Sequence, residues 1–501
     1  MAIAQKIKLT DYLPADCANG RTLWIDGEWQ ASADGQTFPT VDPATGLKIA
    51  SISQGKAADV DRAVQAAKKA SKVWADMDGM QRAAIMRKAA ELIREHRNAL
   101  GTLDSIDSGK TISETAGRNV EGTAAMFDFY AGVTDKIRGS VIDMGPQKTG
   151  LVEKEPYGVV GAISPWNFPM SNAATKIAPI LACGNALVLK PAEQTPLSAL
   201  LLAHILDLAG VPKGVFSVVT GVGAEAGAAL VEHPDVPKIS FTGSTVTGRR
   251  IAAAAGQRLK SVTLELGGKS PFIVFDDADL DAAASGAVTT VFMNQGQTCT
   301  SCAKILVARP LMAAFIEKCK EKVAGIKIGD PLDPKNDLGP IVSTVQLDRV
   351  RRLLAEGLAC GSTQIELKAD YNPLEGGNFI APMIVTDLDP NSSLAKEEIF
   401  GPVMTIYPFD TDAEAYTAAN DTEYGLAASV WTTSLSRAEI ARRTIDTGIV
   451  WINCVHTLSF GTPVPGRKAS GLGSEYGLEV VDNYMQLKTT VTMFGGYRGL
   501  F

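Results

Sequence analysis

The sequence is poor in the residues that build metal centres and nucleic-acid interfaces. It has only four histidines, and neither a pair of them nor a second Cys-x-x-Cys completes a zinc site, so no metal is expected. The net charge is −7 and there is no basic stripe, which argues against a nucleic-acid partner. The chain is 46% hydrophobic and 21% charged, which is ordinary for a globular protein. On composition alone, a structural or interaction protein is also possible.

Long hydrophobic runs are also missing. No apolar stretch approaches 18 residues, so no segment is expected to span a membrane. The N-terminal "MAIAQKIKLTDYLPADC" has basic residues but lacks the continuous apolar core of a signal peptide. Seven cysteines, an odd number in 501 residues, do not form a disulfide framework. A cytoplasmic location is therefore expected.

The organisation of the chain is that of an α/β protein. Amphipathic helices are predicted over residues 57–77, with Val60, Val64, Ala67 and Trp74 on one face, and over residues 80–100. From Tyr157 onward, apolar runs alternate with helical stretches, and the runs are "YGVVGAIS", "NALVLKP", "GVFSVVTG", "KISFTGS" and "SVTLELGG". This alternation predicts a parallel sheet covered on both faces, which binds ligands beyond the carboxyl ends of its strands.

The usual dinucleotide-binding fingerprint is absent. The stretch "GVGAEAG", with Gly221, Gly223 and Gly227, resembles it, but the last glycine comes one place late. Such a glycine cluster is weak evidence for a nucleotide-binding site. Taken alone, it is better interpreted as a turn between a strand and a helix.

The stretch "FMNQGQTCTSC" places Cys299 and Cys302 three residues apart behind a polar turn. A redox pair is expected early in a small domain, and a zinc site needs four ligands, so neither suits this position. Burial in the core is the commonest fate of a free cysteine. The preceding turn instead favours an exposed backbone corner, whose N–H groups would favour a thiolate and an oxyanion.

Two further residues, Glu265 and Asn167, are candidates for a catalytic role. Glu265 stands in the apolar run "LELGGKSP", where burial would raise its pKa toward that of a general base. Asn167, in "SPWNFPMSN", has an amide that could stabilise an oxyanion. Taken alone, each has a simpler interpretation, an ion-paired glutamate or a turn-forming asparagine.

Together these stretches resemble the aldehyde dehydrogenase superfamily over nearly the whole chain. Seven motifs occur in the family's order, namely "SPWNFP", "LVLKPAEQTP", "FTGSTVTG", "LELGGKSP", "NQGQTC", "EEIFGPVM" and "KASGLGSEYG". The resemblance implies a non-acylating enzyme that oxidises an aldehyde to the carboxylic acid, with NAD as cofactor. It also implies an aldehyde dehydrogenase-like α/β fold that combines a Rossmann-type cofactor domain, an α/β catalytic domain and small β oligomerisation segments.

The resemblance assigns roles to single residues. Cys299 matches the catalytic thiol that forms the thiohemiacetal and thioester, Glu265 the base that activates the hydrolytic water, and Asn167 the oxyanion donor. The matching cofactor-binding residues are Trp166, Lys190, Glu193, Gly223, Gly243, Ser244, Glu398 and Phe400. Of these, Lys190 and Glu193 match the residues that hold the adenosine ribose, Ser244 begins the helix at the pyrophosphate, and Glu398 and Phe400 lie on the nicotinamide side.

The family's domain arrangement implies boundaries for this chain. The cofactor domain is expected at residues 1–137 and 159–269, the catalytic domain at 270–478, and the oligomerisation segments at 138–158 and 479–501. These segments imply a homodimer or homotetramer.

The residues of the aldehyde tunnel are also predicted from the resemblance. One wall should carry Met170, Asn172 and Thr175, and the opposite wall Met293, Thr298, Thr300, His456 and Leu458. No arginine occurs among them, so a succinate-like semialdehyde would bury an unpaired carboxylate. A neutral, bulky or aromatic aldehyde is therefore predicted. His456 could equally well only pack beside its loop, without contact to the substrate. The stretch "PVPGRKASG" departs from the wording usual in the family, so the sequence does not predict the shape of the tunnel mouth.

Three alternative functions remain, of which two are enzymatic and one is not. An acylating enzyme would pass the thioester to coenzyme A, although Glu265 would then not be needed as a hydrolytic base. A thiol–disulfide oxidoreductase would use both Cys299 and Cys302. A non-catalytic protein of this fold should have lost Cys299, Glu265 or Asn167, and all three are present.

Overall fold

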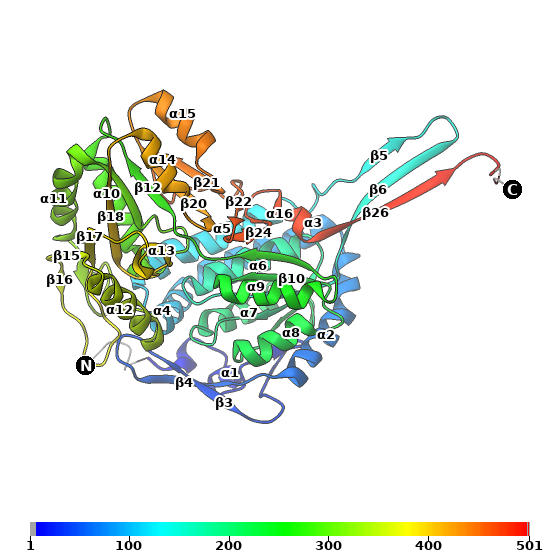
Figure 1. Cartoon of the computed structure of the whole chain (residues 1–501). Helices are drawn as coiled ribbons and strands as arrows, with labels where there is room; N and C mark the ends of the chain where they lie inside the picture. Colours follow the sequence, from blue (N-terminus) through cyan, green and yellow to red (C-terminus); the bar gives the residue numbers. More distant parts are fainter. Residues whose placement is uncertain (1–6, 498, 500–501) are drawn as a thin grey trace.

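The five apolar runs form the parallel centre of an eight-stranded sheet in the computed structural model, which describes residues 7–497 and 499 (Figure 1). They are β7 (Val159–Ile163), β8 (Ala186–Lys190), β9 (Phe216–Val218), β10 (Lys238–Thr242) and β11 (Ser261–Glu265). Their order in space is β9-β8-β7-β10-β11, so the direction of winding changes between β7 and β10. In such a sheet a ligand-binding crevice forms at this point, beyond the carboxyl ends of the strands.

Three antiparallel strands complete this first sheet. The hairpin of β1 (Leu23–Ile25) and β2 (Glu28–Gln30) extends the sheet beyond β9, and β24 (Gly471–Leu472) pairs with β11 at the other edge. Residues 471–472, which the predicted boundaries assign to the catalytic domain, thus belong to the first sheet. The C-terminal part of the chain thereby returns to the end of the strand that carries Glu265.

Helices cover both faces of the first sheet. One face carries α2 (Ala57–Ala75), α8 (Ala228–Glu232) and α9 (Thr245–Gly256), and the other carries α3 (Gly79–Glu95), α4 (Arg97–Ser108), α5 (Val120–Ala131), α6 (Pro169–Ala182) and α7 (Leu197–Ala209). The predicted apolar face of α2 is buried. The helix predicted over residues 80–100 is divided into α3 and α4, because His96 takes a non-helical ψ of 19°.

A second, seven-stranded sheet follows from residue 271 onward. In spatial order its strands are β15 (Thr363–Glu366), β17 (Met383–Thr386), β18 (Val403–Phe409), β13 (Lys304–Ala308), β12 (Pro271–Val274), β20 (Ala427–Trp431) and β21 (Ile449–Ile452). Only β15 runs antiparallel to its neighbour. The accompanying helices are α10 (Leu280–Phe292), α11 (Met312–Val323), α12 (Thr344–Ala359), α13 (Ser393–Lys396), α14 (Asp412–Asn420) and α15 (Leu435–Thr444).

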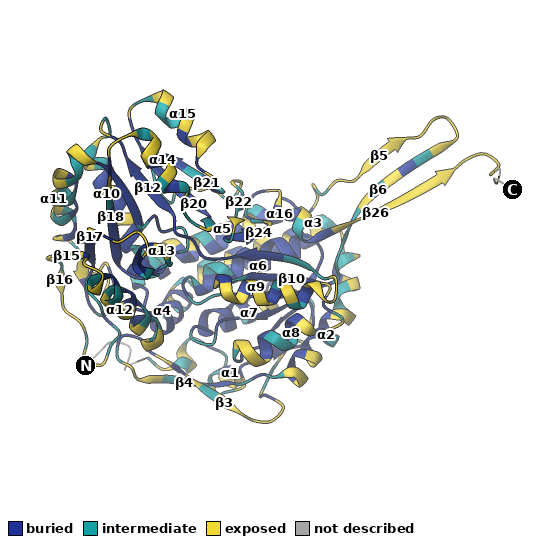
Figure 2. Ribbon diagram, viewed as in Figure 1, coloured by how far each residue is buried: buried dark blue, intermediate teal, exposed yellow. Residues whose placement is uncertain are grey.

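A three-stranded sheet projects from the body of the molecule (Figure 1). It contains β5 (Ser140–Asp143), β6 (Lys148–Pro156) and β26 (Met485–Met493), in the order β26-β6-β5. Figure 2 shows β5 and β26 exposed along nearly their whole length. The strands predicted outside both cores therefore pair with each other, although more than 300 residues separate β6 from β26 in the chain.

The remaining elements are short. They are α1 (Ala15–Ala18), α16 (Val480–Asn483), β3 (Thr37–Val41), β4 (Lys48–Ser53), β14 (Lys327–Ile328), β16 (Asp370–Tyr371), β19 (Tyr424–Gly425), β22 (Val464–Pro465), β23 (Arg467–Lys468) and β25 (Ser474–Glu475), with the irregular turns η2 (Leu9–Asp11), η3 (Ser113–Asn119), η4 (Gly223–Gly227), η5 (Met293–Gly296) and η6 (Arg309–Leu311). None of the helices in residues 7–497 and 499 combines the length and the apolar character that a membrane crossing requires.

Candidate active site

The residues predicted for catalysis and cofactor binding gather at one edge of the first sheet. Asn167 follows β7, Lys190 ends β8, Ser244 follows β10 and Glu265 ends β11. Because these strands are parallel and adjacent, their carboxyl ends meet at the same edge. Residues separated by up to 98 positions in the sequence are thus brought to the crevice of an α/β sheet.

Cys299 reaches this edge on a turn that follows α10. Asn294, Gln295 and Gly296 all have positive φ angles, of 52°, 56° and 73°. A side chain at Gly296 would meet the Gly401 carbonyl oxygen at 2.1 Å, so only glycine fits there. The strained turn reverses the chain and presents Cys299, half-buried, beside the end of β11.

Close packing joins this turn to the strand that carries Glu265. A Cβ atom added to Gly268 would lie 2.7 Å from the carbonyl oxygen of Cys299. The glycine pair after Glu265, noted in the sequence, therefore allows the backbone of the nucleophile loop to approach the end of β11.

Asn167 is held against the same turn by its own amide. Its Nδ2 donates to the Gln297 carbonyl oxygen at 3.0 Å, and its Oδ1 accepts from Asn172 Nδ2 at 3.2 Å. Asn294 Nδ2 donates to the Asn167 carbonyl oxygen at 2.8 Å. The second proton of the Asn167 amide remains available for an oxyanion next to Cys299.

Burial dominates the electrostatics of the thiol. It raises the pKa of Cys299 to about 12, and the carboxylates of Glu398, Glu265 and Glu475 add to the effect. The sequence predicted that the turn would favour a thiolate, whereas desolvation first and the neighbouring carboxyl groups second act in the opposite direction and outweigh the backbone N–H groups. The thiol has to transfer its proton as it attacks.

Glu265 has the surroundings predicted for a base. Its side chain is buried, and its Oε1 atom makes no hydrogen bond within residues 7–497 and 499. Burial raises its pKa well above the ordinary value, the Glu475 carboxylate raises it further, and the Lys176 ammonium lowers it. An unsatisfied carboxyl oxygen beside the thiol can accept a proton or hold a water molecule.

Lys176 and Glu475 form a buried ion pair that the sequence analysis missed. Lys176 Nζ lies 2.9 Å from Glu475 Oε1 and also donates to the hydroxyls of Ser240 and Thr242. Glu475 lies in the quoted motif "KASGLGSEYG", and Lys176 is the only charged residue of α6, which was the available signal. The pair modifies the charge environment of Glu265 from the side of α6.

Glu398 contacts the Gly267-Gly268 pair, and Phe400 contacts Trp166. Gly268 N–H donates to Glu398 Oε1 at 2.9 Å, and burial raises the pKa of Glu398 to about 7. The rings of Phe400 and Trp166 meet edge to face, with centroids 5.2 Å apart. Trp166 and Phe400 thus contact each other, and Glu398 contacts Gly268, while the place of all three on the nicotinamide side stays a prediction.

The predicted ribose-binding pair is an ion pair at the end of β8. Lys190 Nζ lies 2.7 Å from Glu193 Oε2, with Lys190 buried and the Glu193 side chain 34% exposed. Burial raises the pKa of Glu193, but Lys190 and the backbone N–H of Gly223 lower it more, so it lies below its ordinary value. Glu193 thus presents an ionised acceptor, and Gly223 lies beside it.

Gly243 and Ser244 lead from β10 into α9. Gly243 N–H donates to the Glu265 carbonyl oxygen at 3.0 Å, and Ser244 caps the helix by accepting from Thr247 N–H. Ser244 is exposed, so the first turn of this 12-residue helix faces solvent at the same edge. An anionic group is stabilised at such a position.

A comparison with known families identifies this architecture. The aldehyde dehydrogenase family model matches residues 29–490. The chain belongs to the aldehyde dehydrogenase family. The resemblance predicted from the seven motifs, and the α/β fold that it implied, are confirmed.

Solved structures of aldehyde dehydrogenases superpose closely on the chain. A Burkholderia cenocepacia protein assigned as an aldehyde dehydrogenase is 40% identical, with a TM-score of 0.93, over 96% of this chain and 99% of its own. A mutant of the P. syringae indole-3-acetaldehyde dehydrogenase AldA, in complex with NAD+ and IAA, is 37% identical, with a TM-score of 0.93, over 98% of both chains. An E. coli NADP-dependent enzyme is 37% identical, with a TM-score of 0.92, over 95% and 98%.

The predicted tunnel residues of this aldehyde dehydrogenase lie in different surroundings. Met170 is fully buried in the core of the first domain, so its predicted place on the tunnel wall is wrong. Met170 is the second residue of α6, its N–H donates to Asp104 Oδ1, and its side chain points into the core. Asn172 is half-buried and bonded to Asn167, and Thr175 is buried with its hydroxyl donated to Ser171.

The residues predicted for the opposite wall come from the nucleophile turn and the loop after β21. Thr298 is buried, and its hydroxyl has no partner within residues 7–497 and 499, whereas Met293 contacts Arg118. Thr300 and His456 are hydrogen-bonded to each other at 3.3 Å. Leu458 is 40% exposed, and its contact with a substrate stays a prediction.

Cys302 has a packing role. It is fully buried, its N–H donates to Thr290 Oγ1 at 3.0 Å, and its Sγ lies 3.6 Å from the Thr300 carbonyl oxygen. Burial raises its pKa to about 12. These contacts account for Cys302 without a redox role.

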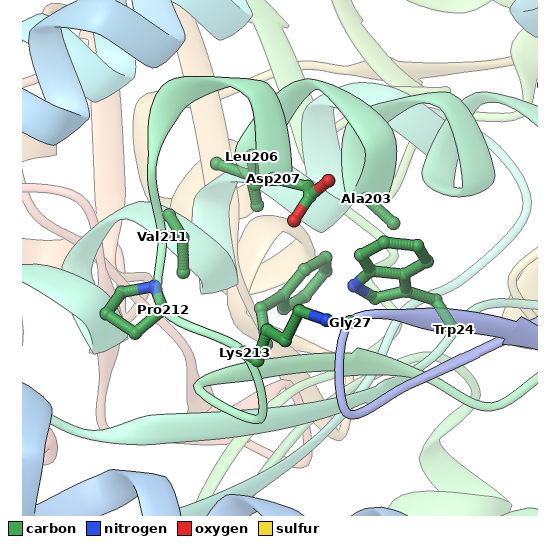
Figure 3. Close-up of a pocket in the computed structure, with 9 residues that line it drawn as sticks. Trp24, Gly27, Ala203, Leu206, Asp207, Val211, Pro212 and Lys213 are labelled. Carbon is green, nitrogen blue, oxygen red and sulfur yellow. The ribbon is translucent and has the colours of Figure 1, made fainter.

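A small cavity lies at the other end of the first sheet, away from Cys299 and Glu265. Figure 3 shows its lining at the end of α7 and the β1–β2 turn, with Trp24, Asp207 and Lys213 among the residues. It adjoins Phe216, at the amino end of β9, whereas the site described above lies at the carboxyl ends. Its volume of about 10 Å³ holds about one water molecule, so it is no substrate site.

Proposed function

We propose that the protein catalyses the NAD-dependent oxidation of an aldehyde to the carboxylic acid, with Cys299 as nucleophile, Glu265 as base and Asn167 as oxyanion donor. The observation that carries this proposal is the convergence of the three residues on one turn. Asn167 donates to Gln297, two residues before Cys299, and the Cys299 carbonyl oxygen packs against Gly268, the third residue after Glu265.

The first half of the reaction forms a bond between Cys299 and the substrate. The thiol sulfur adds to the aldehyde carbon, its proton passes to the carboxylate of Glu265, and the carbonyl oxygen becomes an oxyanion. The free N–H of Asn167 Nδ2 and the Cys299 backbone N–H stabilise that oxyanion. Loss of one such donor costs on the order of a hundred- to a thousandfold in rate.

The chemistry that NAD would supply at this place is acceptance of a hydride from the carbon attached to Cys299, after which that carbon would remain bound to the sulfur as a thioester. Glu265 releases to solvent the proton that it took from the thiol, and its carboxylate then takes a proton from a water molecule that attacks the thioester carbonyl. Its unpartnered Oε1 is the acceptor that this step needs. The carboxylic acid leaves, and the Cys299 thiol is restored.

The residues at the sheet edge fit NAD. Glu193 offers a partly exposed carboxylate to the two hydroxyls of a ribose, and the first turn of α9 offers N–H groups to a pyrophosphate. Trp166, Glu398 and Phe400 border the place of the nicotinamide. A 2′-phosphate would face the Glu193 charge, a repulsion of about 1 kcal/mol or more, so NAD is preferred over NADP.

The proposed substrate is a neutral, bulky or aromatic aldehyde. Rings of Phe129, Phe460 and Tyr476 pack in sequence, with centroid separations of 6.4 and 6.2 Å, and Tyr476 directly follows Glu475 in the chain. The AldA structure contains IAA, an observation about that protein that supports an aromatic substrate here. Comparison of kcat/KM for benzaldehyde, hexanal and succinic semialdehyde tests this, and a clear preference for succinic semialdehyde would contradict it.

We also propose a homodimer or homotetramer in the cytoplasm. The projecting sheet of β5, β6 and β26 exposes Val141, Leu487 and Val491, of which 71%, 71% and 56% are accessible. An exposed apolar sheet of this kind is suited to a second copy of the chain. The mass in solution, measured by light scattering, tests the assembly.

Mutation of the two neighbouring cysteines tests the proposed chemistry. Cys299→Ala should abolish NADH formation from aldehyde, because no other thiol lies on the turn beside Glu265. Cys302→Ala should keep most of the activity, with some loss of stability from the cavity it leaves. Equal loss of activity in both variants would contradict a single nucleophile.

A further inference from the structure

His456 stands in an unusual backbone conformation on the loop after β21. Its φ angle is +50°, in the left-handed region that residues other than glycine seldom adopt. The loop is fixed by a hydrogen bond from Trp451 Nε1 to the Thr457 carbonyl oxygen at 3.0 Å. The Trp451 and His456 rings pack edge to face, with centroids 5.5 Å apart. Such strain persists where surrounding contacts hold it, and often at functional sites.

The two ring nitrogens of His456 contact two different segments. Nε2 lies 3.0 Å from Thr290 Oγ1 on α10, and Nδ1 lies 3.3 Å from Thr300 Oγ1. Thr300 is the residue that follows Cys299. The ring therefore connects the loop after β21 to the helix that leads into the nucleophile turn and to the nucleophile's own neighbour.

The hydrogen bonds around Thr290 indicate which nitrogen carries the proton. Thr290 Oγ1 accepts the N–H of Cys302 at 3.0 Å and has its own proton to donate to His456 Nε2. The ring proton then belongs on Nδ1, which donates to Thr300 Oγ1. Burial lowers the pKa of His456 to about 4, with Arg118 as the charged neighbour that adds to the shift, so the ring is neutral at working pH.

We propose that His456 is a positioning residue for the nucleophile, acting through Thr300 rather than through contact with the substrate. Its ring holds Thr300, while Thr290 holds Cys302, so both sides of the segment after Cys299 are fixed to one network. The sulfur of Cys299 is thereby kept where it can reach the aldehyde carbon. The inference rests on the proposed role of Cys299.

The mildest test removes single hydroxyls. Thr300→Val loses the acceptor for Nδ1–H with little change of shape, whereas Thr300→Ser keeps it. The NADH burst with benzaldehyde and saturating NAD, followed by stopped flow, should slow on the order of ten- to a hundredfold in Thr300→Val and stay near wild type in Thr300→Ser, because small displacements of a reacting group are costly. Ser459→Ala is the matched control, since that loop hydroxyl bonds only its loop neighbour Thr462 in the structure.

A second measurement reports the position of the thiol without substrate or cofactor. The rate at which iodoacetamide alkylates Cys299, read by mass spectrometry, should change in Thr300→Val and His456→Ala in parallel with the burst rate. His456→Asn should recover part of the loss, because asparagine tolerates a positive φ and keeps an N–H donor near the Nδ1 position.

The outcomes separate the possible roles. A change in the KM of the aldehyde alone, with unchanged alkylation, would mean that His456 contacts substrate, and the proposal would be overturned. Loss of thermal stability with normal burst and alkylation rates would overturn it equally. Activity in Cys299→Ala would instead refute the proposed function, which these variants do not test.

Discussion

The Lys176 ammonium lies 2.9 Å from the Glu475 carboxylate, and both side chains are buried between the first sheet and the returning C-terminal segment. The two residues are 299 positions apart. The two residues act on Glu265 in opposite directions, because Glu475 raises its pKa and Lys176 lowers it. The ion pair therefore influences the protonation of the base. The chemistry at Cys299 is thus coupled to a contact outside the nucleophile turn.

Glu265→Gln should separate the two halves of the reaction. Addition and hydride transfer should still give a burst of NADH, slowed where Glu265 takes the thiol proton, and turnover should then stall at the thioester. Stopped-flow absorbance and mass spectrometry of the stalled enzyme would show the burst and the acyl adduct on Cys299. Steady turnover at the wild-type rate would mean that another group activates the water.

Glu475→Gln should move the pH dependence of turnover. Deacylation needs the Glu265 carboxylate, so the rate falls as pH falls through the raised Glu265 pKa. Removal of the Glu475 charge removes a cause of that raised pKa, and the acid limb should move to lower pH. The broken pair should also destabilise the fold by about 3–5 kcal/mol, measured by denaturant unfolding.

The exposed Glu479 provides a matched control for that variant. Glu479→Gln removes a carboxylate four residues further along the chain and should leave the acid limb in place. An unshifted limb in Glu475→Gln would show that the rate reports a different ionisation, such as that of Glu398, whose pKa is about 7.

Glu193→Gln should weaken the preference for NAD over NADP. The amide keeps the shape of the side chain but removes the charge that would face a 2′-phosphate. A repulsion of about 1 kcal/mol corresponds to roughly fivefold in the ratio of kcat/KM values. Glu225→Gln, a change at an exposed carboxylate bonded to Gln54, is the control. A wild-type enzyme that prefers NADP would refute the argument.

Gly268→Ala should impair catalysis through the backbone of Cys299. The added methyl group would lie 2.7 Å from the Cys299 carbonyl oxygen, so the turn or the end of β11 has to move. We expect kcat to fall on the order of a hundredfold. In Gly256→Ala the added atom meets nothing within 4 Å, and that helical change should leave kcat unchanged. Normal kcat in Gly268→Ala would show that the turn tolerates the displacement.

The features that depend on local chemistry were predictable from the order of the residues. Uniformly apolar strands identified the parallel sheet, because both of its faces are covered by helices. Glycines, prolines and polar turn residues marked the ends of those strands, where Asn167, Ser244 and Glu265 lie. The order of seven motifs then identified the family, and the assigned residue types were sufficient to write the reaction.

The effects of these side chains on one another depend on how whole helices and strands pack in three dimensions. The rotation of α6 turns Met170 into the core and Lys176 toward Glu475, and the return of β24 to the first sheet brings Glu475 there. The raised pKa of Cys299 depends on burial and on carboxylates from three other segments, which outweigh the local turn. His456 meets Thr290 and Thr300 across more than 150 residues of chain. Contacts at such separations depend on the packing of whole elements, and no local pattern of residues encodes them.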